Sequence, residues 1–372
     1  MPAKRASLRI ASQEISRAQK NAMKALLDFW NITLQSVEPP DIAYLFKLAR
    51  AFISTKELDK AHQVLDYIVK HFLTSDGDFS RPLPSPNPKK RKHSTDTPDA
   101  VKSLNGVYND YWVYTNGWIL LAMIESGWHE KYPVDFQKAY GFMMNYLSED
   151  SKKAFTNRLR TQTDILSIAH MGCLLLAVNT PESQQKAYQL ANTLCELFIK
   201  HQHPSTFPLR FNAQTLEPIN NDNSQLFYQY HARENGQLHF MIAYPAAFLA
   251  LLSKSLENEG NIEDAKKMLD AAKNYFNLAL KAPDVYQSLF SHKLAWAASI
   301  HYSITHKQPD ANHAIEIMKH FTAEQAKDGT WHKGDPLNQC DQTAEICCWL
   351  AKIIEHLRPE PALTADNYAS TP

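Results

Sequence analysis

The chain of 372 residues carries a small set of carboxylates and imidazoles placed where they could exchange protons with a substrate. Asp341 stands where a segment with helical spacing begins, and the carboxylate of Glu345 lies nearby. Such groups serve as general acids and bases when burial or a neighbouring charge tunes their pKa. The predicted catalytic residues are Asp164, His239, His292, Asp341 and Glu345. Asp164 and Asp341 equally suit the capping of helix N-termini, so capping is the alternative role for each.

Aromatic residues are dense beside these groups, around 108–118 and 227–231. Aromatic faces stabilise cations and also stack on sugar rings. The predicted substrate-binding residues are Tyr108, Trp112, Tyr114, Asn116, Phe227, Tyr230, His231, Glu234, Tyr244, Trp296 and Trp331. His170 and His301 lie in the middle of apolar helical segments, and we expect them to be core histidines.

The elements that must position these residues are helices. Apolar residues recur at helical spacing in about twelve segments. These segments are 12–36, 41–54, 59–73, 111–126, 133–148, 163–177, 183–201, 238–254, 261–279, 291–304, 310–325 and 341–356. Segments that are apolar all round alternate with segments that are charged on one side. Since the first kind is buried and the second covers it, the sequence predicts an all-α fold, an (α/α)6 double-ring barrel.

The predicted connections differ in length according to direction. Those that leave a buried helix are short, whereas most of those that enter one are long, which gathers the long loops at the N-termini of the inner helices. Long loops on a rigid scaffold commonly carry function. An open solenoid is the rival fold, but no repeat of about 34 residues is visible. We expect one domain over 1–372, with disorder in the loop 81–100 and in the tail 358–372.

Composition excludes several classes of protein. The chain holds 39 Lys plus Arg and 39 Asp plus Glu, and this balance argues against nucleic acid as a partner. The charged start lacks a secretory signal, no uninterrupted apolar run could span a membrane, and three of the five cysteines lie in apolar helical runs, so we expect a cytoplasmic protein. Phosphate-loop and common zinc motifs are absent, so we expect neither a cofactor nor a metal. The sequence leaves the oligomeric state open.

Two motifs near the C-terminus resemble those of a known superfamily. The stretch 321–331, with Gln325 and Trp331, resembles the Gln-Trp repeat of oxidosqualene cyclases and protein prenyltransferase β subunits. The stretch from Asp341 to Glu345 resembles the Asp-Cys-Thr-Ala-Glu motif of oxidosqualene cyclases, although Gln342 replaces the cysteine and Cys340 precedes it. The resemblance implies a toroid of helices in which Asp341 protonates the substrate.

On that resemblance the expected function is a cyclase or isomerase of secondary metabolism. Its substrate would be a hydrophobic polyene, meroterpenoid or epoxide in an aromatic cavity, with Asp341 as the acid. One alternative is a sugar-active (α/α)6 enzyme, either hydrolase, lyase or 2-epimerase, in which Asp164 with Asp341 or Glu234 would act as acid and base. Another is a non-catalytic helical binding module. An aromatic, water-poor cavity favours the cyclase, whereas a polar cleft favours a sugar.

Overall fold

A computed structural model describes residues 2–36, 40–79, 112–157, 159–220, 225–332 and 336–358. The predictions for the loop 81–100 and, Arg358 apart, for the tail 358–372 lie outside these residues.

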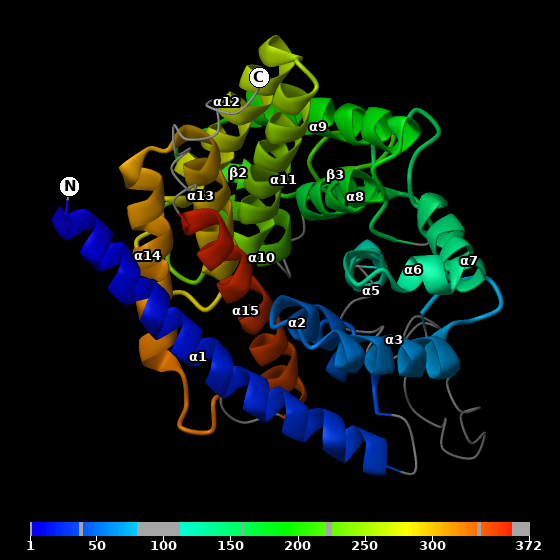
Figure 1. The fold of residues 1–372 in the computed structure, drawn as a ribbon. Helices are drawn as coiled ribbons and strands as arrows, with labels where there is room; N and C mark the ends of the chain where they lie inside the picture. The colour runs from blue at the N-terminus through cyan, green and yellow to red at the C-terminus, as the bar shows by residue number, and fades with distance from the viewer. Residues whose placement is uncertain are drawn as a thin grey trace, which may run out of the picture.

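The described residues form twelve helices of seven residues or more, in two alternating sets. The inner helices are α2 (Leu48–Ser54), α5 (Trp112–Glu125), α8 (Ile165–Val178), α11 (His239–Asn258), α13 (His292–Thr305) and α15 (Pro336–Leu357). The outer helices are α1 (Pro2–Gln35), α3 (Leu58–Phe72), α7 (Pro133–Met144), α9 (Pro181–His201), α12 (Ile262–Ala279) and α14 (Gln308–Glu324). Each inner helix packs on the next, and α15 packs on α2, which closes the ring (Figure 1). The predicted (α/α)6 barrel is confirmed, and the open solenoid is wrong.

The two rings follow from the two sequence patterns. In α8 every residue from Ile165 to Leu175 is buried, as its uniformly apolar sequence predicts. In α3 the buried residues are Ala61, Val64, Leu65, Ile68 and Phe72, the spacing of a single helical stripe. An inner helix is therefore enclosed by neighbours on all sides, and an outer helix covers it with one face.

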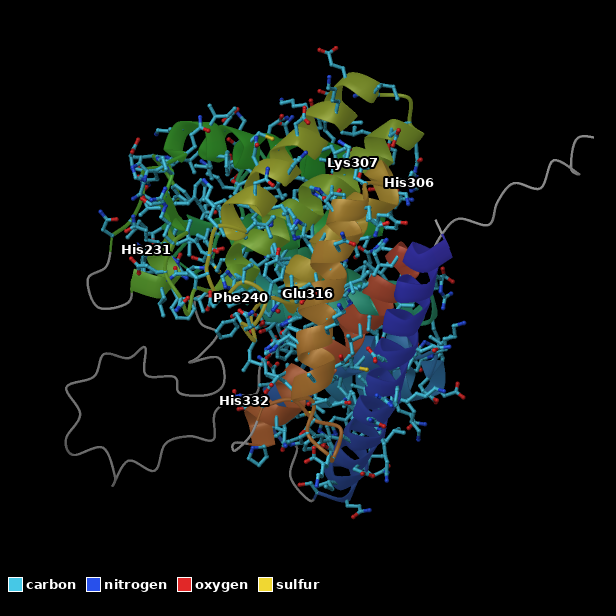
Figure 2. All side chains as sticks on the ribbon, turned by 90° about the vertical axis from the view of Figure 1, so that its left-hand side faces the viewer. His231, Phe240, His306, Lys307, Glu316 and His332 are labelled. Atoms are coloured by element: carbon cyan, nitrogen blue, oxygen red, sulfur yellow. The ribbon has the colours of Figure 1, made fainter. Side chains whose placement is uncertain are left out.

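All inner helices begin at the same end of the barrel, which we call the N-terminal end. Figure 2 shows α14 running down from Lys307 at the top to the turn that holds His332 at the bottom, while α13 ends beside His306 at the top. Thus α13 and α15 run upward and α14 runs downward. As predicted, the long connections enter the inner helices and the short ones leave them, so the long connections gather at the N-terminal end.

The long connections also contain short strands, which the prediction from helical spacing missed. Strands β1 (Gln162–Asp164) and β3 (Arg210–Asn212) pair antiparallel, as do β2 (Thr206–Pro208) and β4 (Gln229–His231). Two short helices, η1 (Ile42–Tyr44) and α10 (Gln225–Tyr228), also lie in connections that enter inner helices, whereas α6 (Trp128–Lys131) lies in the short connection that leaves α5. Strands of three residues are too short to produce a clear alternation in the sequence.

The Gln-Trp stretch joins the ends of the chain to one another. The side-chain amide of Gln325 donates to the carbonyls of Ala18 at 2.8 Å and Gly329 at 2.9 Å. Trp331 is buried, and its indole N–H donates to the carbonyl of Phe321 at 2.8 Å. Gly329 has φ +89, and a Cβ there would lie 2.3 Å from the carbonyl oxygen of Asn21. This turn therefore fixes α1 against α14 and α15, beside which α1 runs in Figure 1.

One helix, α11, is long and apolar enough to cross a membrane, by length and composition alone. Of its most apolar window, 78% is buried inside the protein, where it packs between α8, α12 and α13. Enclosure in the inner ring accounts for this apolar composition.

Candidate functional site

Two carboxylates of α15 share one buried ammonium group on the barrel axis. The Nζ of Lys47 donates to Oδ2 of Asp341 at 2.8 Å and to Oε2 of Glu345 at 2.7 Å. Asp341 and Glu345 are one helical turn apart, so their side chains leave α15 on the same face. Lys47 directly precedes α2, the ring neighbour of α15. None of the three side chains is more than 4% exposed.

Two further inner helices complete this group. The Nζ of Lys293 lies 2.6 Å from Oε1 of Glu345, and the hydroxyl of Tyr114 donates to the same oxygen at 2.8 Å. His292 Nε2 lies 3.2 Å from Nζ of Lys293, and His292 Nδ1 lies 2.8 Å from the carbonyl of Leu289. Nδ1 therefore carries the proton, and Nε2 accepts from the ammonium. We call these six residues, Lys47, Tyr114, His292, Lys293, Asp341 and Glu345, the ionic cluster.

Burial and charge drive the pKa values of the two carboxyls apart. Burial raises the pKa of Asp341 above its ordinary value, and the attraction of Lys47 does not cancel this effect. Burial acts on Glu345 as well, but Lys293 and Lys47 hold the pKa of Glu345 well below its usual range. One carboxyl is thus able to take up and release a proton, while the other stays an anion.

Two nitrogen groups of the cluster, those of His292 and Lys293, have pKa values shifted toward the neutral form. Burial lowers the pKa of Lys293 to about 8, although Glu345 opposes this shift. Burial and the adjacent Lys293 lower the pKa of His292, so this imidazole is neutral near pH 7. Two ammonium groups therefore face two carboxyls, and Oδ1 of Asp341 makes no hydrogen bond to the described part of the chain. Among the carboxylate oxygens of the ionic cluster, it is the one without a hydrogen-bond partner in the described residues.

Asp341 is not the helix cap that the sequence allows. The helix α15 begins at Pro336, more than a turn before Asp341, so the carboxyl lies inside the helix. A helix terminus favours the ionised carboxylate only within its first turn. This placement removes the conflict between the helix dipole and a raised pKa.

Six aromatic rings, each next to the following one, form a closed loop across the barrel axis beside the ionic cluster. Its members, in order, are Tyr114, His170, Tyr244, Trp296, Trp349 and Trp118, with neighbouring ring centroids between 4.2 and 6.0 Å apart. We call this the aromatic layer. The guanidinium of Arg50 in α2 lies 4.6 Å from the ring centroid of Trp118, so all six inner helices contribute to this level of the barrel. The indole N–H of Trp349 reaches Oε1 of Glu345 at 3.4 Å, which joins the layer to the cluster.

Beyond the aromatic layer, a cavity of about 370 Å³ opens among the C-terminal ends of the inner helices. Arg50, His170, Tyr244, Trp296 and Trp349 line its floor, and its walls include Glu125, Lys254 and Lys352. We call it the axial cavity. The sequence predicted a cavity only at the N-terminal end of the barrel, where the long loops gather. The axial cavity lies at the opposite end.

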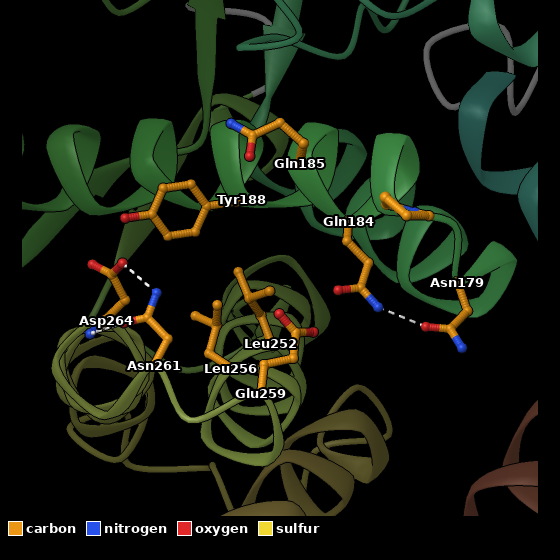
Figure 3. A pocket seen from close by; sticks show the side chains of 10 residues that line it. Asn179, Gln184, Gln185, Tyr188, Leu252, Leu256, Glu259, Asn261 and Asp264 are labelled. Carbon is orange, nitrogen blue, oxygen red and sulfur yellow. Dashed lines mark hydrogen bonds between the residues drawn. The ribbon is translucent and has the colours of Figure 1, made fainter.

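Another hollow, of about 720 Å³, lies between α9, α11 and α12 (Figure 3). Its side chains are largely amides and exposed carboxylates that bond one another, as Gln184 does to Asn179 and Asn261 to Asp264. No buried acid–base group is among the residues that line it.

Two of the predicted catalytic residues, Asp164 and His239, bond residues outside the ionic cluster. Asp164 caps α8, because Oδ1 accepts from the backbone N–H of Ser167 at 2.6 Å, and its Oδ2 lies 3.6 Å from the Arg210 guanidinium. His239 lies between Tyr230, 2.8 Å from Nδ1, and Asp284, 3.2 Å from Nε2. His292, Asp341 and Glu345 are therefore brought together, whereas no described contact joins Asp164 or His239 to them.

The predicted substrate-binding residues are divided in the same way. Tyr114, Tyr244 and Trp296 lie on the axis, as described above. Of the others, Asn116 donates to Asp78 at 3.0 Å, Trp331 fixes the turn after α14, and Phe227 packs against the core. His231 and Glu234 pair with each other at 3.5 Å, and the Glu234 side chain is 65% exposed. Tyr108 and the side chain of Trp112 lie outside the described residues.

Sequence reasoning assigned no role to Lys47, Arg50 or Lys293. The available signal was a charge within an otherwise apolar segment, since a buried Lys or Arg must be paired. His170, expected to be a core residue, is buried but also faces the axial cavity.

The residues described contain no group of three or more His, Cys, Asp or Glu side chains arranged to hold a metal ion. The thiol of Cys340 donates to the carbonyl of Tyr44 at 3.4 Å. The hydrogen bond of this thiol therefore goes to the backbone and not to the carboxyl of Asp341.

The closed double ring defines the class of this protein as an (α/α)6 barrel, and solved structures share it. A D-mannose isomerase matches with a TM-score of 0.59 and 12% identity, over 90% of this chain and 97% of that chain. A family 76 glycoside hydrolase from a bovine Bacteroides thetaiotaomicron strain matches with a TM-score of 0.49 and 14% identity, over 83% of this chain and 67% of that chain. In sequence, neither a family model nor a curated protein matches. The resemblance to terpenoid cyclases is thus supported for the toroid fold and not for the reaction.

Proposed function

We propose that this chain is a sugar-active enzyme that moves a proton between neighbouring carbons of a free sugar, as an isomerase or epimerase. The observation that carries the proposal is the ionic cluster, in which a carboxyl with a raised pKa has one oxygen without a hydrogen bond to the described residues and lies beside two ammonium groups. Burying four charged groups stabilises a fold poorly, so their retention on the axis favours a catalytic role. The shared fold with a D-mannose isomerase supports the choice of substrate class.

In the proposed step, Asp341 acts as the base. The C–H bond beside the sugar carbonyl breaks, its proton goes to Oδ1 of Asp341, and the electron pair forms an enediolate. The ammonium groups of Lys47 and Lys293 stabilise the negative oxygen, as an oxyanion site does. For the isomer, Asp341 returns the proton to the former carbonyl carbon, while the hydroxyl proton of the neighbouring carbon passes to the former carbonyl oxygen, so that the carbonyl moves by one position. For the epimer, the enediolate first turns its opposite face to Asp341, which then returns the proton to the carbon from which it came. The cluster is buried, so described residues around it must move for a sugar to reach Asp341.

The cluster does not suit the expected polyene cyclase. A cyclase of that type needs a strong acid and then holds a carbocation near it. Burial makes Asp341 a weaker acid, and the ammonium groups of Lys47 and Lys293 would repel a cationic intermediate. The hydrophobic substrate expected from the sequence is therefore replaced by a polar one in this proposal.

Glycoside hydrolysis is also disfavoured by the geometry. Hydrolases place the scissile bond between two carboxyl groups. Here the ammonium of Lys47 occupies the place between Asp341 and Glu345 and bonds both. A sugar cannot lie between these carboxyls unless Lys47 leaves.

Hydrogen exchange into a free sugar tests the proposal. The full chain would be incubated in D₂O with D-mannose and with a panel of other free aldoses. Proton NMR would follow the loss of the signal from the hydrogen on the carbon next to the carbonyl, as deuterium replaces it. We expect exchange and a new ketose or epimer with at least one sugar, lost in Asp341→Asn and retained in Glu316→Gln, whose side chain is exposed. If no aldose exchanged its hydrogen although the aldoses bound to the chain, the result would support a non-catalytic binding module instead.

A further inference from the structure

We propose that the axial cavity is a second small-molecule site, which binds a sugar that carries a phosphate or carboxylate group. Its position separates it from the ionic cluster. Neither Lys47, Lys293, Asp341 nor Glu345 lines the cavity, and the aromatic layer forms its floor. The inference does not rest on the proposed reaction.

The floor contains buried polar groups that lack hydrogen bonds. Both ring nitrogens of His170 and the hydroxyl of Tyr244 make no hydrogen bond of normal geometry to the described part of the chain, and Tyr114 is the polar neighbour of both groups. His170 is 0% exposed and Tyr244 is 1% exposed. An unsatisfied buried polar group is costly, and a ligand that bonds it removes that cost.

The protonation state of His170 fits a hydroxyl-bearing ligand. Burial lowers its pKa to about 3, so the imidazole is neutral and offers one donor and one acceptor. A sugar hydroxyl provides the complementary pair. Gly117 makes room for this ring, because a Cβ at that position would lie 2.5 Å from Nε2 of His170. The stacked indoles of Trp296 and Trp349, with centroids 4.2 Å apart, give the body of the ligand an apolar wall.

The walls nearer the opening carry an excess of positive charge. Glu125 accepts two hydrogen bonds from Arg50, at 2.9 and 2.7 Å, and one from Lys352 at 2.9 Å. Lys254 is exposed at the cavity and makes no ion pair with the described residues. Three cations and one carboxylate therefore line the cavity, which leaves a net charge of two positive units to attract an anion.

These features specify the orientation of the ligand. Its anionic group lies at the opening, near Lys254 and Lys352, and its hydroxyls reach His170 and Tyr244. Phosphate and carboxylate sugars share this chemistry, and the experiment separates them.

Binding to the full chain would be measured by calorimetry and by thermal shift with four probes. These probes are glucose 6-phosphate, glucuronate, glucose and inorganic phosphate. We expect a sugar that carries an anionic group to bind at least tenfold more tightly than glucose or inorganic phosphate, since only it engages both ends of the cavity. Whichever of the first two binds more tightly identifies the anion. Equal affinity for all four probes, or no binding, would overturn the proposal.

Two variants locate the binding. Lys254→Met should weaken binding of the charged sugar about tenfold, whereas Lys266→Met, at an exposed lysine of α12 outside the cavity, should not change it. Tyr244→Phe keeps the ring and removes only the unsatisfied hydroxyl, so the unliganded protein should be no less stable while affinity falls at least threefold. Full affinity in both Lys254→Met and Tyr244→Phe would show that the ligand binds elsewhere. The deuterium-exchange assay is independent, so each proposal can fail alone.

Discussion

The ammonium nitrogen of Lys293 lies 2.6 Å from Oε1 of Glu345, in a region where both side chains are almost completely buried. Burial lowers the pKa of this lysine to about 8, even though the carboxylate stabilises its charged form. The charge that would stabilise an enediolate is therefore lost within the range of ordinary assays. This has a measurable consequence for the pH dependence of the reaction.

Turnover should follow a bell-shaped pH profile. Asp341 must be ionised to act as a base, so activity rises with pH through its raised pKa. Lys293 must be protonated, so activity falls as the pH passes about 8. In Lys293→Arg the guanidinium stays charged, and the basic limb should move above pH 10. A variant that kept its basic limb near pH 8 would remove Lys293 from the proposed mechanism.

Asp341→Asn should lower turnover by about 10²- to 10⁴-fold, the usual range for loss of a general base. The amide keeps the shape of the side chain, so the melting temperature and ligand affinity should change little. Rates would be measured at the pH optimum against Glu316→Gln. Turnover within threefold of the parent chain would show that Asp341 only balances the charge of Lys47.

Glu345→Gln should destabilise the fold by about 3–5 kcal/mol at pH 7, because two ammonium groups lose a shared buried anion. The pKa of Glu345 is held well below its ordinary 4.5, so its contribution is present above that pH and is lost as the pH falls further. Urea unfolding should show a difference from the parent chain that shrinks below about pH 4.5. A difference that is constant from pH 3 to 7 would contradict this account.

Gly117→Ala should destabilise the fold by about 1–3 kcal/mol, because the added methyl overlaps the ring of His170. Gly141→Ala is the matched control, since this position also lies in a helix, α7, and no atom lies within 4 Å of its added Cβ. The control should instead stabilise by about 0.5–1 kcal/mol through helix propensity. Equal effects of the two substitutions on the melting temperature would show that the His170 packing is looser than described.

Asp164→Asn should act on stability and not on the chemical step. The amide still caps α8, but the buried Arg210 loses the negative charge beside it. We expect a lower urea midpoint and, at temperatures where the variant is folded, a normal pH profile and turnover. A selective loss of turnover would restore Asp164 as the catalytic acid.

The sequence predicted the helices of the two rings better than it predicted the contacts of the side chains on the barrel axis. Helix periodicity located segments such as 183–201 to within about two residues, since burial of a stripe or of a whole helix depends on neighbours that are near in sequence. The start of α15 was placed late, at 341 instead of 336, because the first turn of that helix lacks an apolar pattern. Asp341 and Glu345 were found through a local motif.

The partners of those carboxylates could not be found in the same way. Lys47 reaches them only because α2 and α15 are ring neighbours, and no local pattern records that contact. The axial cavity was missed for a related reason. Loop lengths indicate where extra chain gathers, but a cavity at the other end depends on the sizes of side chains that meet from several helices, such as Tyr244 and Trp296.

The bond between Lys47 and Asp341 joins positions 294 residues apart, at the seam where the last inner helix closes on the first. During synthesis the chain emerges from its N-terminus onward, so Lys47 leaves the ribosome long before the carboxylates that neutralise it exist. Until α15 is made, the first inner helix has neither its neighbour nor its counter-charges. The ionic cluster therefore cannot form before α15 has been made, and a nascent or truncated chain that ends before Asp341 cannot carry out the proposed reaction.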